Sequence, residues 1–82
     1  MRVTLFNVKA GDKVVLNEEG KRYINVNQTE PTISKFKSIT HGIVLSNNPH
    51  KSYISVNWID YKGKVIYIDW YIYRTYLDLY EG

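Results

Sequence analysis

The residues best suited to acid–base or metal chemistry are two histidines and three carboxylates. His41 and His50 each adjoin a predicted turn, and the chain has no cysteine that could act with them as a nucleophile or metal ligand. The carboxylates are Asp60, Asp69 and Asp78, and the first two are expected at different levels of one β-hairpin. Acid–base catalysis and metal binding both need side chains that converge on one point, which this spacing does not indicate. We therefore predict that the protein is not an enzyme and has no catalytic residues, metal ligands or cofactor.

Tyrosine side chains are the strongest candidates for a binding surface. Residues 53–74 read YISVNWIDYKGKVIYIDWYIYR, and their alternation places one set of polar and aromatic side chains on the same face of a β-hairpin. This set is Tyr53, Tyr67, Asp69, Tyr71 and Tyr73. We predict that it binds a partner protein, because tyrosine is enriched at protein interfaces. Three alternatives stay open: the tyrosines stabilise the sheet by cross-strand contacts worth up to about 1 kcal/mol each, they stack on nucleic-acid bases, or residues 22–40 cover them as a second core.

A set of lysine and arginine side chains lies in or beside predicted loops and could bind an anionic partner. The set is Lys21, Arg22, Lys35, Lys37, Lys51, Lys62 and Lys64. The net charge of +3 is unevenly distributed, with +5 over residues 1–64 and −2 over residues 65–82. Loop lysines are ordinarily solvated, so the alternative function, nucleic-acid binding, needs these loops to gather at one end of the molecule. Such a cluster would give a moderate affinity that falls steeply with salt.

The hairpin must position these side chains, and its register depends on its turn. A three-residue loop at residues 61–63 pairs Trp58 with Ile66 and places Gly63 where a positive φ is required. The apolar side chains then lie on one face, whereas a shift of one residue would expose the whole set. The predicted core positions are Ile54, Val56, Trp58, Ile66, Ile68, Trp70 and Ile72. The other predicted pairs are Val56–Ile68 and Ile54–Trp70 on this face, and Asn57–Tyr67, Ser55–Asp69 and Tyr53–Tyr71 on the opposite face.

The rest of the chain contains short β-patterns separated by turns. Strands are predicted at residues 13–16, 42–46 and 76–80, in addition to the hairpin, with a weaker alternation at 2–8. Residues 22–40 are the least regular, and we predict a short strand around 23–26, a polar loop, and a strand from about residue 36, because Thr, Ile, Ser and Phe do not favour helix. We therefore expect one all-β domain over residues 1–82, a small barrel of five to six strands with a long central hairpin.

Four segments resemble the Src-homology-3-like small β-barrels, which include the Tudor, agenet-like and KOW-type modules. The segments are VKAGDKVVL at 8–16, HGIVLSN at 41–47, YISVNWID at 53–60 and YLDLYE at 76–81. The resemblance implies a barrel whose loops gather around one open end, and the KOW-type modules imply nucleic-acid contact there. The Tudor modules imply an aromatic cage that binds methylated ammonium groups by cation–π attraction, for which Tyr53, Tyr61 and Tyr23 are the candidates.

Composition adds expectations about location and origin. The chain has no cysteine and no apolar run near the roughly 20 residues of a membrane span, so we expect a cytoplasmic protein that does not contact the membrane. Its many Lys, Asn, Ile and Tyr residues have AT-rich codons, which favours a bacteriophage or low-GC bacterial gene. The leading hypothesis is a small phage-type or bacterial protein that modulates a partner protein or host complex through its tyrosine-rich face. Nucleic-acid binding is the alternative, and a homo-oligomer formed through a strand edge or the tyrosine face is a third hypothesis.

Overall fold

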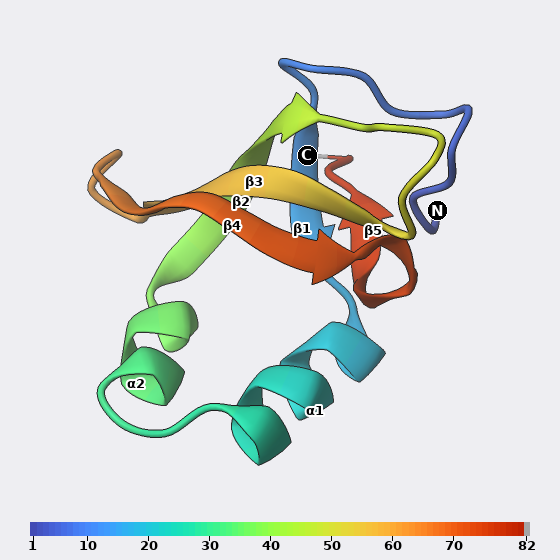
Figure 1. Cartoon of the computed structure of the whole chain (residues 1–82). Helices are drawn as coiled ribbons and strands as arrows, with labels where there is room; N and C mark the ends of the chain where they lie inside the picture. Colours follow the sequence, from blue (N-terminus) through green and yellow to red (C-terminus); the bar gives the residue numbers. More distant parts are fainter. Residues whose placement is uncertain (82) are drawn as a thin grey trace.

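The computed structural model describes residues 1–81, and over this range the chain forms one antiparallel sheet with two short α-helices (Figure 1). The strands are β1 (Lys13–Leu16), β2 (Ile39–Ser46), β3 (Tyr53–Asp60), β4 (Val65–Tyr73) and β5 (Leu77–Leu79). The helices α1 (Glu18–Asn27) and α2 (Thr32–Lys37) lie between β1 and β2 in the chain, and a 3₁₀ turn, η1 (Arg74–Tyr76), joins β4 to β5. No helix in the described chain is long and apolar enough to cross a membrane.

The sheet has the strand order β4-β3-β2-β1-β5, so the predicted predominance of β-structure is confirmed. At the β5 edge, the N-terminal segment adds two backbone hydrogen bonds: Val3 N–H donates to Leu77 O at 2.9 Å, and Leu79 N–H donates to Met1 O at 2.7 Å. The other edge is β4. Over residues 1–81, β4 and β5 do not pair, and closure of the sheet into a barrel is not observed.

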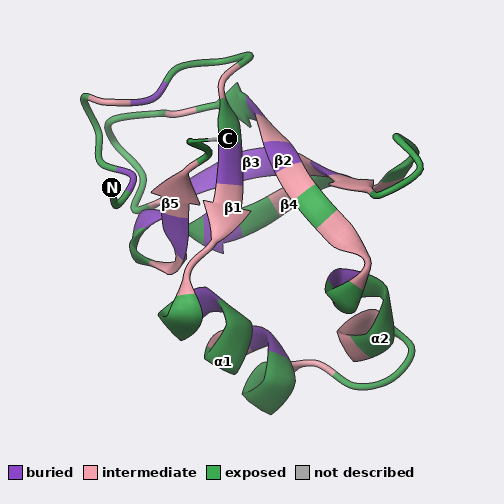
Figure 2. Ribbon diagram, turned by 180° about the vertical axis from the view of Figure 1, so that it is seen from behind, coloured by how far each residue is buried: buried purple, intermediate pink, exposed green. Residues whose placement is uncertain are grey.

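The core lies on the inner face of the sheet, which we define as the face toward the helices (Figure 2). Its most deeply buried side chains, each less than 2% exposed, are Val14, Val44, Ile54, Val56, Trp58 and Leu77. Ile24 of α1 and Phe36 of α2 join this cluster, and the Phe36 ring meets the Trp58 ring edge-on with 5.7 Å between centroids. Trp58 is therefore enclosed between the sheet and α2.

Residues 23–26 belong to α1, so the short strand predicted there is wrong. Asn17 caps the helix, because its Oδ1 accepts a 2.9 Å hydrogen bond from Gly20 N–H. Glu18 and Glu19 lie in the first turn, where a carboxylate interacts favourably with the helix dipole. Gly20 and Ile24 are one turn apart and form the buried side of the helix. Capping and burial together outweigh the β-propensity of the segment.

Residues 32–37 form α2, where the sequence predicted a loop that runs into a strand. Phe36 is 8% exposed and packs against Trp58, Tyr67 and Trp70 with ring centroids 5.2–5.7 Å apart. Most helical stability in proteins comes from burial of one face rather than from propensity. One aromatic side chain packed against three others therefore stabilises a turn and a half of helix that its residues do not favour on their own.

The predicted long hairpin is confirmed, and its turn has the predicted geometry. Asp60 N–H donates to Lys64 O at 2.9 Å, and Gly63 has a φ of +82°. The first cross-strand pair, Ile59–Val65, also has the register that a three-residue loop requires. Turn chemistry is local, which is why the sequence alone predicted this part of the hairpin.

Beyond that first pair the predicted register is wrong, because two register shifts, consistent with β-bulges in β4, interrupt the ladder. The observed pairs are Trp58–Tyr67, Val56–Trp70, Ser55–Tyr71, Ile54–Ile72 and Tyr53–Tyr73, which replace every predicted pair. Each shift places one additional residue in β4 relative to β3, and the second includes Asp69, whose φ is +55°. Two insertions restore the original alternation, so Trp70 and Ile72 face inwards as predicted. Between the bulges the faces exchange: Tyr67 packs against the core, and Ile68 is 74% exposed.

Gly42 of β2 permits a close contact at the centre of the core. It pairs with Trp58 of β3, and a Cβ at this position would lie 2.9 Å from two carbons of the indole ring and closer still to Val56. Core atoms are already in van der Waals contact, so a larger residue could enter only by displacing both Val56 and the tryptophan.

Gly42→Ala is expected to lower the free energy of unfolding by about 1–3 kcal/mol, because it overpacks the contact with Trp58. Urea unfolding measures this difference. The control Gly63→Asn changes an exposed glycine whose positive φ asparagine tolerates, and it should cost less than about 1 kcal/mol. A Gly42→Ala variant as stable as the wild type would contradict a fixed contact between β2 and Trp58.

Candidate functional site

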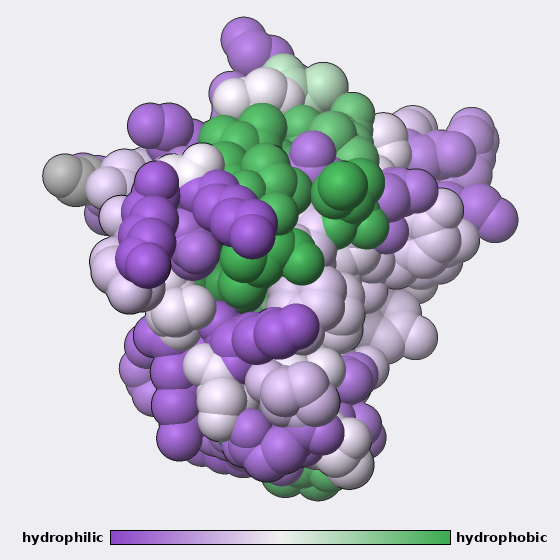
Figure 3. Space-filling view, turned by 90° about the vertical axis from the view of Figure 1, so that its left-hand side faces the viewer, coloured by the Kyte–Doolittle hydropathy of each residue, from purple (hydrophilic) through white to green (hydrophobic). Residues whose placement is uncertain are grey.

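The outer face of the sheet, opposite the core, carries a row of aliphatic side chains. Val65 of β4 pairs with Ile59 of β3, which pairs with His41 of β2, and cross-strand partners project from the same face. Ile43 lies two residues further along β2 and therefore on the same face. Leu45 follows at a register shift between Val44 and Ser46, and it is 40% exposed, the same value as Val65. We call Ile43, Leu45, Ile59 and Val65 the aliphatic patch. Figure 3 shows a continuous hydrophobic area above the helices, on the side of the molecule toward the hairpin turn.

Three of the predicted tyrosines gather on the same face at the other end of the hairpin. Tyr53 pairs with Tyr73, Tyr71 pairs with Ser55, and the rings of Tyr53 and Tyr71 lie 5.2 Å apart. Tyr71 and Tyr73 are 63% and 48% exposed. We call Tyr53, Tyr71 and Tyr73 the tyrosine group. Because β3 alternates without interruption from residue 53 to residue 59, the tyrosine group and the aliphatic patch share one face.

Tyr67 does not belong to the tyrosine group, which corrects its predicted position. Its ring stacks on Phe36 at 5.3 Å and contacts Trp70 at 4.8 Å, and its hydroxyl donates to Thr32 Oγ1 at 3.3 Å. The first bulge in β4 turns Tyr67 to the inner face, where α2 covers it. Of the four predicted tyrosines, Tyr53, Tyr71 and Tyr73 are therefore brought together, and Asp69 lies beside them in the chain at the second bulge.

The three carboxylates lie apart from one another, and two have structural partners. Asp60 Oδ1 accepts two 2.9 Å hydrogen bonds from backbone N–H groups of the hairpin turn. Asp78 Oδ1 accepts a 3.4 Å hydrogen bond from Asn17 Nδ2. Asp69 is exposed at the second bulge, where its backbone N–H donates to Asn57 Oδ1 at 2.9 Å. Within residues 1–81, there is no group of three or more His, Asp or Glu side chains that could hold a metal ion.

His41 is the cross-strand partner of Ile59 and therefore lies beside the aliphatic patch. Its Nδ1 lies 2.9 Å from Thr40 Oγ1, and its ring lies 5.6 Å from the ring of Tyr80. Burial, and then the positive charge of Lys13, lower the pKa of His41 below its ordinary value of 6.5. The imidazole is therefore neutral at pH 7 and adds no charge to the patch beside it.

The basic residues of the alternative site are divided among several elements, contrary to the expected gathering at one end. Lys21 and Arg22 lie on α1, Lys35 and Lys37 on α2, Lys51 in the loop before β3, and Lys62 and Lys64 in the turn after it. β3 has eight residues, so Lys62 and Lys64 are separated from Lys51 by roughly 26 Å, the length of the strand. The two helices interrupt what the sequence predicted to be loop.

The aromatic cage implied by the Tudor resemblance does not form. Tyr23 lies on α1 and stacks on Tyr76 with 4.6 Å between ring centroids. Tyr53 begins β3, whereas Tyr61 follows the last residue of that strand and is 69% exposed. Three rings at three separate places cannot enclose one ammonium group.

A buried arginine that sequence reasoning missed organises the loop before β3. Arg74 is 8% exposed, and its Nε donates to Asn47 Oδ1 at 2.7 Å. Its Nη2 donates to Asn48 O at 2.6 Å, and its Nη1 donates to Lys51 O. Asn47 Nδ2 donates in turn to Val8 O at 3.1 Å, so two side chains join three segments that are distant in sequence. The one sequence signal for this buried arginine is its position: Arg74 is a charged residue at the point where the alternation of β4 ends.

No protein-family model matches this chain, and no similar curated protein or solved structure is found. The chemistry of the candidate site therefore follows from its own side chains. The outer face offers apolar contact, tyrosine hydroxyls and a neutral imidazole.

The free energy of unfolding should fall as the pH is lowered through 6.5, and it should fall less in His41→Gln. The reason is that the histidine binds a proton more readily in the unfolded chain than in the folded one, so protonation favours unfolding. Urea unfolding of both proteins between about pH 8 and about pH 5 measures the difference. Identical pH dependence in the two proteins would contradict the lowered pKa of His41.

Arg74→Lys is expected to lower the free energy of unfolding by about 2 kcal/mol, because an ammonium group cannot serve three acceptors in the planar geometry of a guanidinium. Guanidinium chloride unfolding measures the loss. Arg2→Lys is the matched control: Arg2 pairs with Glu19 at 3.0 Å, but both side chains are about half exposed, so it should cost less than about 1 kcal/mol. Equal losses in the two variants would contradict a special role for Arg74.

Proposed function

We propose that this protein is a non-enzymatic module that binds another protein through the outer face of its sheet. The observation that carries the proposal is the aliphatic patch, which crosses three neighbouring strands on the face opposite the helices. Contiguous exposed apolar area of this kind, bordered by polar residues, is typical of protein interaction sites. The tyrosine group extends the same face with rigid aromatic side chains that contribute contact area at low entropic cost.

The charges around the patch indicate a partner with apolar side chains surrounded by acidic ones. Lys13 pairs with Ile43 and therefore projects from the same face. Lys62 and Lys64 lie in the turn that leads into Val65. Positive side chains at the rim of an apolar contact favour an acidic rim on the partner and increase the rate of association.

The distribution of basic side chains supports protein binding over nucleic-acid binding. A nucleic acid needs a positive track along its backbone. Here the basic residues lie on two helices and at both ends of β3, whereas the apolar side chains are contiguous. Composition supports the narrower hypothesis of a phage-type or bacterial modulator of a host complex, and the curved sheet is compatible with a relative of the Src-homology-3-like barrels.

Val65→Asp is expected to weaken partner binding at least tenfold, because it places a carboxylate in the apolar patch and opposite an acidic rim. Immobilised wild-type and variant proteins are incubated with extract of the native host cell, and the retained proteins are quantified by mass spectrometry. The dissociation constant for the retained protein is then measured by calorimetry. Val26→Asp is the matched control, because Val26 is 74% exposed on α1, away from the outer face.

Three outcomes would contradict the proposal. Equal retention by Val65→Asp and the wild type, with both folded by circular dichroism, would exclude the patch as the binding surface. Sedimentation that shows a wild-type dimer and a Val65→Asp monomer would assign the face to a second copy of this chain. Binding to short oligonucleotides at about 50 mM salt that is lost in Lys62→Gln and retained in Val65→Asp would favour nucleic acid instead.

A further inference from the structure

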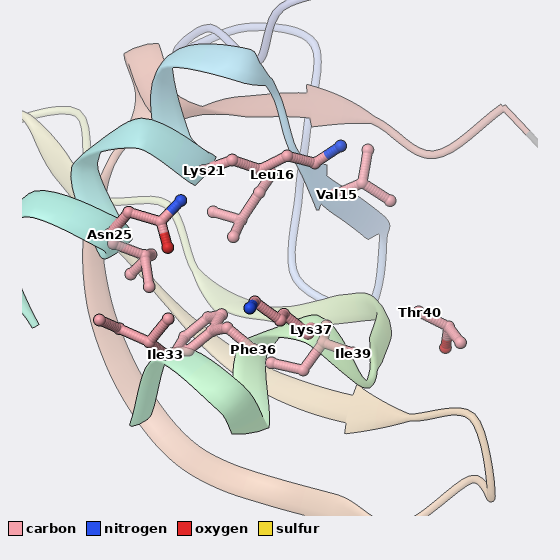
Figure 4. Close-up of a pocket in the computed structure, with 10 residues that line it drawn as sticks. Val15, Leu16, Lys21, Asn25, Ile33, Phe36, Lys37, Ile39 and Thr40 are labelled. Atoms are coloured by element: carbon pink, nitrogen blue, oxygen red, sulfur yellow. The ribbon is translucent and has the colours of Figure 1, made fainter. Parts of the chain in front are cut away.

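A separate cavity lies between the two helices and the diverging ends of β1 and β2 (Figure 4). Its volume is about 470 Å³, within the range of roughly 300–1,000 Å³ that is typical of small-molecule sites. None of the four residues of the aliphatic patch lines this cavity, so it is a candidate site separate from the proposed protein interface.

The cavity exists because β1 and β2 pair over only a short distance. Lys13–Ile43 and Val14–Gly42 are the paired positions in the described chain, and beyond them β1 leads into α1 while β2 begins at the end of α2. Leu16, Ile33 and Ile39 line the opening that results. All three remain partly exposed, although Leu16 and Ile39 pack against the core.

The cavity walls are mostly apolar, and buried core residues form the deepest part. Ile24 and Phe36 line it with 2% and 8% exposure, and Leu16, Ile33 and Ile39 complete the apolar surface. Partly exposed aliphatic side chains around a preformed concavity favour an apolar ligand, because its binding removes their surface from water.

Three polar side chains lie at the mouth of the cavity. Figure 4 shows the Lys37 ammonium group and the Asn25 carboxamide directed toward its interior, and the Lys21 side chain running along the rim. Lys21 pairs with Glu18 at 3.5 Å, whereas Lys37 has no ion-pair partner among residues 1–81. An unpaired ammonium group and an amide donor beside an apolar cavity are complementary to a single carboxylate.

We propose that this cavity binds an amphiphilic monocarboxylate, that is, a medium-chain fatty acid or a similar molecule with an apolar body. The apolar body lies among Leu16, Ile33 and Phe36, and the carboxylate accepts hydrogen bonds from Lys37 and Asn25. The ligand is a monoanion because, of the two lysines among the described lining residues, Lys21 is paired with Glu18 and only Lys37 is left to neutralise an anion.

The test is a two-dimensional amide and methyl NMR titration of the full chain with decanoate. We expect saturable shifts confined to the cavity residues, and weaker binding of decan-1-ol, which keeps the apolar chain without the charge. Lys37→Gln should weaken decanoate binding about tenfold, because it removes a charge-assisted hydrogen bond. Lys51→Gln removes the same charge from a distant loop and should leave the affinity unchanged. Ile33→Trp, a substitution at a partly exposed position, should fill the cavity and abolish binding.

Several results would overturn the proposal. Shifts that do not saturate, or that spread over the outer face, would show a detergent-like interaction with the exposed patch. Decyltrimethylammonium binding as tightly as decanoate would exclude recognition of the carboxylate. Equal losses of decanoate affinity in Lys37→Gln and Lys51→Gln would show that the net charge of the protein, and not a contact with Lys37, determines binding. Should Ile33→Trp fail to fold by circular dichroism, the comparison of Lys37→Gln with Lys51→Gln decides the question without it.

Discussion

The fold depends on the enclosure of Trp58 between a glycine of one strand and a phenylalanine of a short helix. Gly42 leaves the space on β2 that the indole ring occupies, and Phe36 covers the ring from α2. This contact joins the sheet to the helices and defines the inner face of β3. Alternation then places Tyr53, Asn57 and Ile59 on the outer face, with Ser55 buried between them, so the composition of this face is a consequence of how one tryptophan is buried.

The two bulges in β4 decide which aromatic side chains a partner can reach. They turn Tyr67 to the inner face, where it stacks on Phe36, and they leave Tyr71 and Tyr73 exposed. β4 is also an edge strand with unpaired backbone groups, and a bulged, twisted edge pairs poorly with a second strand. The same irregularity therefore divides the tyrosines and disfavours association through the strand edge.

The outer face and the cavity share one physical origin in the small size of the chain. A domain of 82 residues cannot bury all of its apolar side chains, and the sheet leaves one face without a covering layer. On the inner side, two short helices cover the core incompletely where β1 and β2 diverge. A concavity remains there, lined by Lys37, which has no ion-pair partner within residues 1–81. The two surfaces differ in shape and in charge, and the occupants proposed for them differ accordingly: a broad protein surface for the first and a small anionic amphiphile for the second.

Features that depend on neighbouring residues could be read from the sequence: the hairpin, the positive φ of Gly63, and the inward orientation of Ile54, Val56 and Trp58. Turn chemistry and alternation are local, so a single segment contains all that is needed. For α1 the sequence does hold a local signal, the Asn17 cap with Glu18 and Glu19 after it, which the β-propensity of the following residues outweighed in the prediction. Neither α2, nor the bulges, nor the buried Arg74 could be read in this way. Asn17 caps α1 and also donates from Nδ2 to Thr75 O at 2.9 Å, and Arg74 is buried by acceptors in a loop more than twenty residues away. Such contacts form between segments that meet only in the folded chain, and their energies exceed the modest local propensities on which the prediction for residues 22–40 depended.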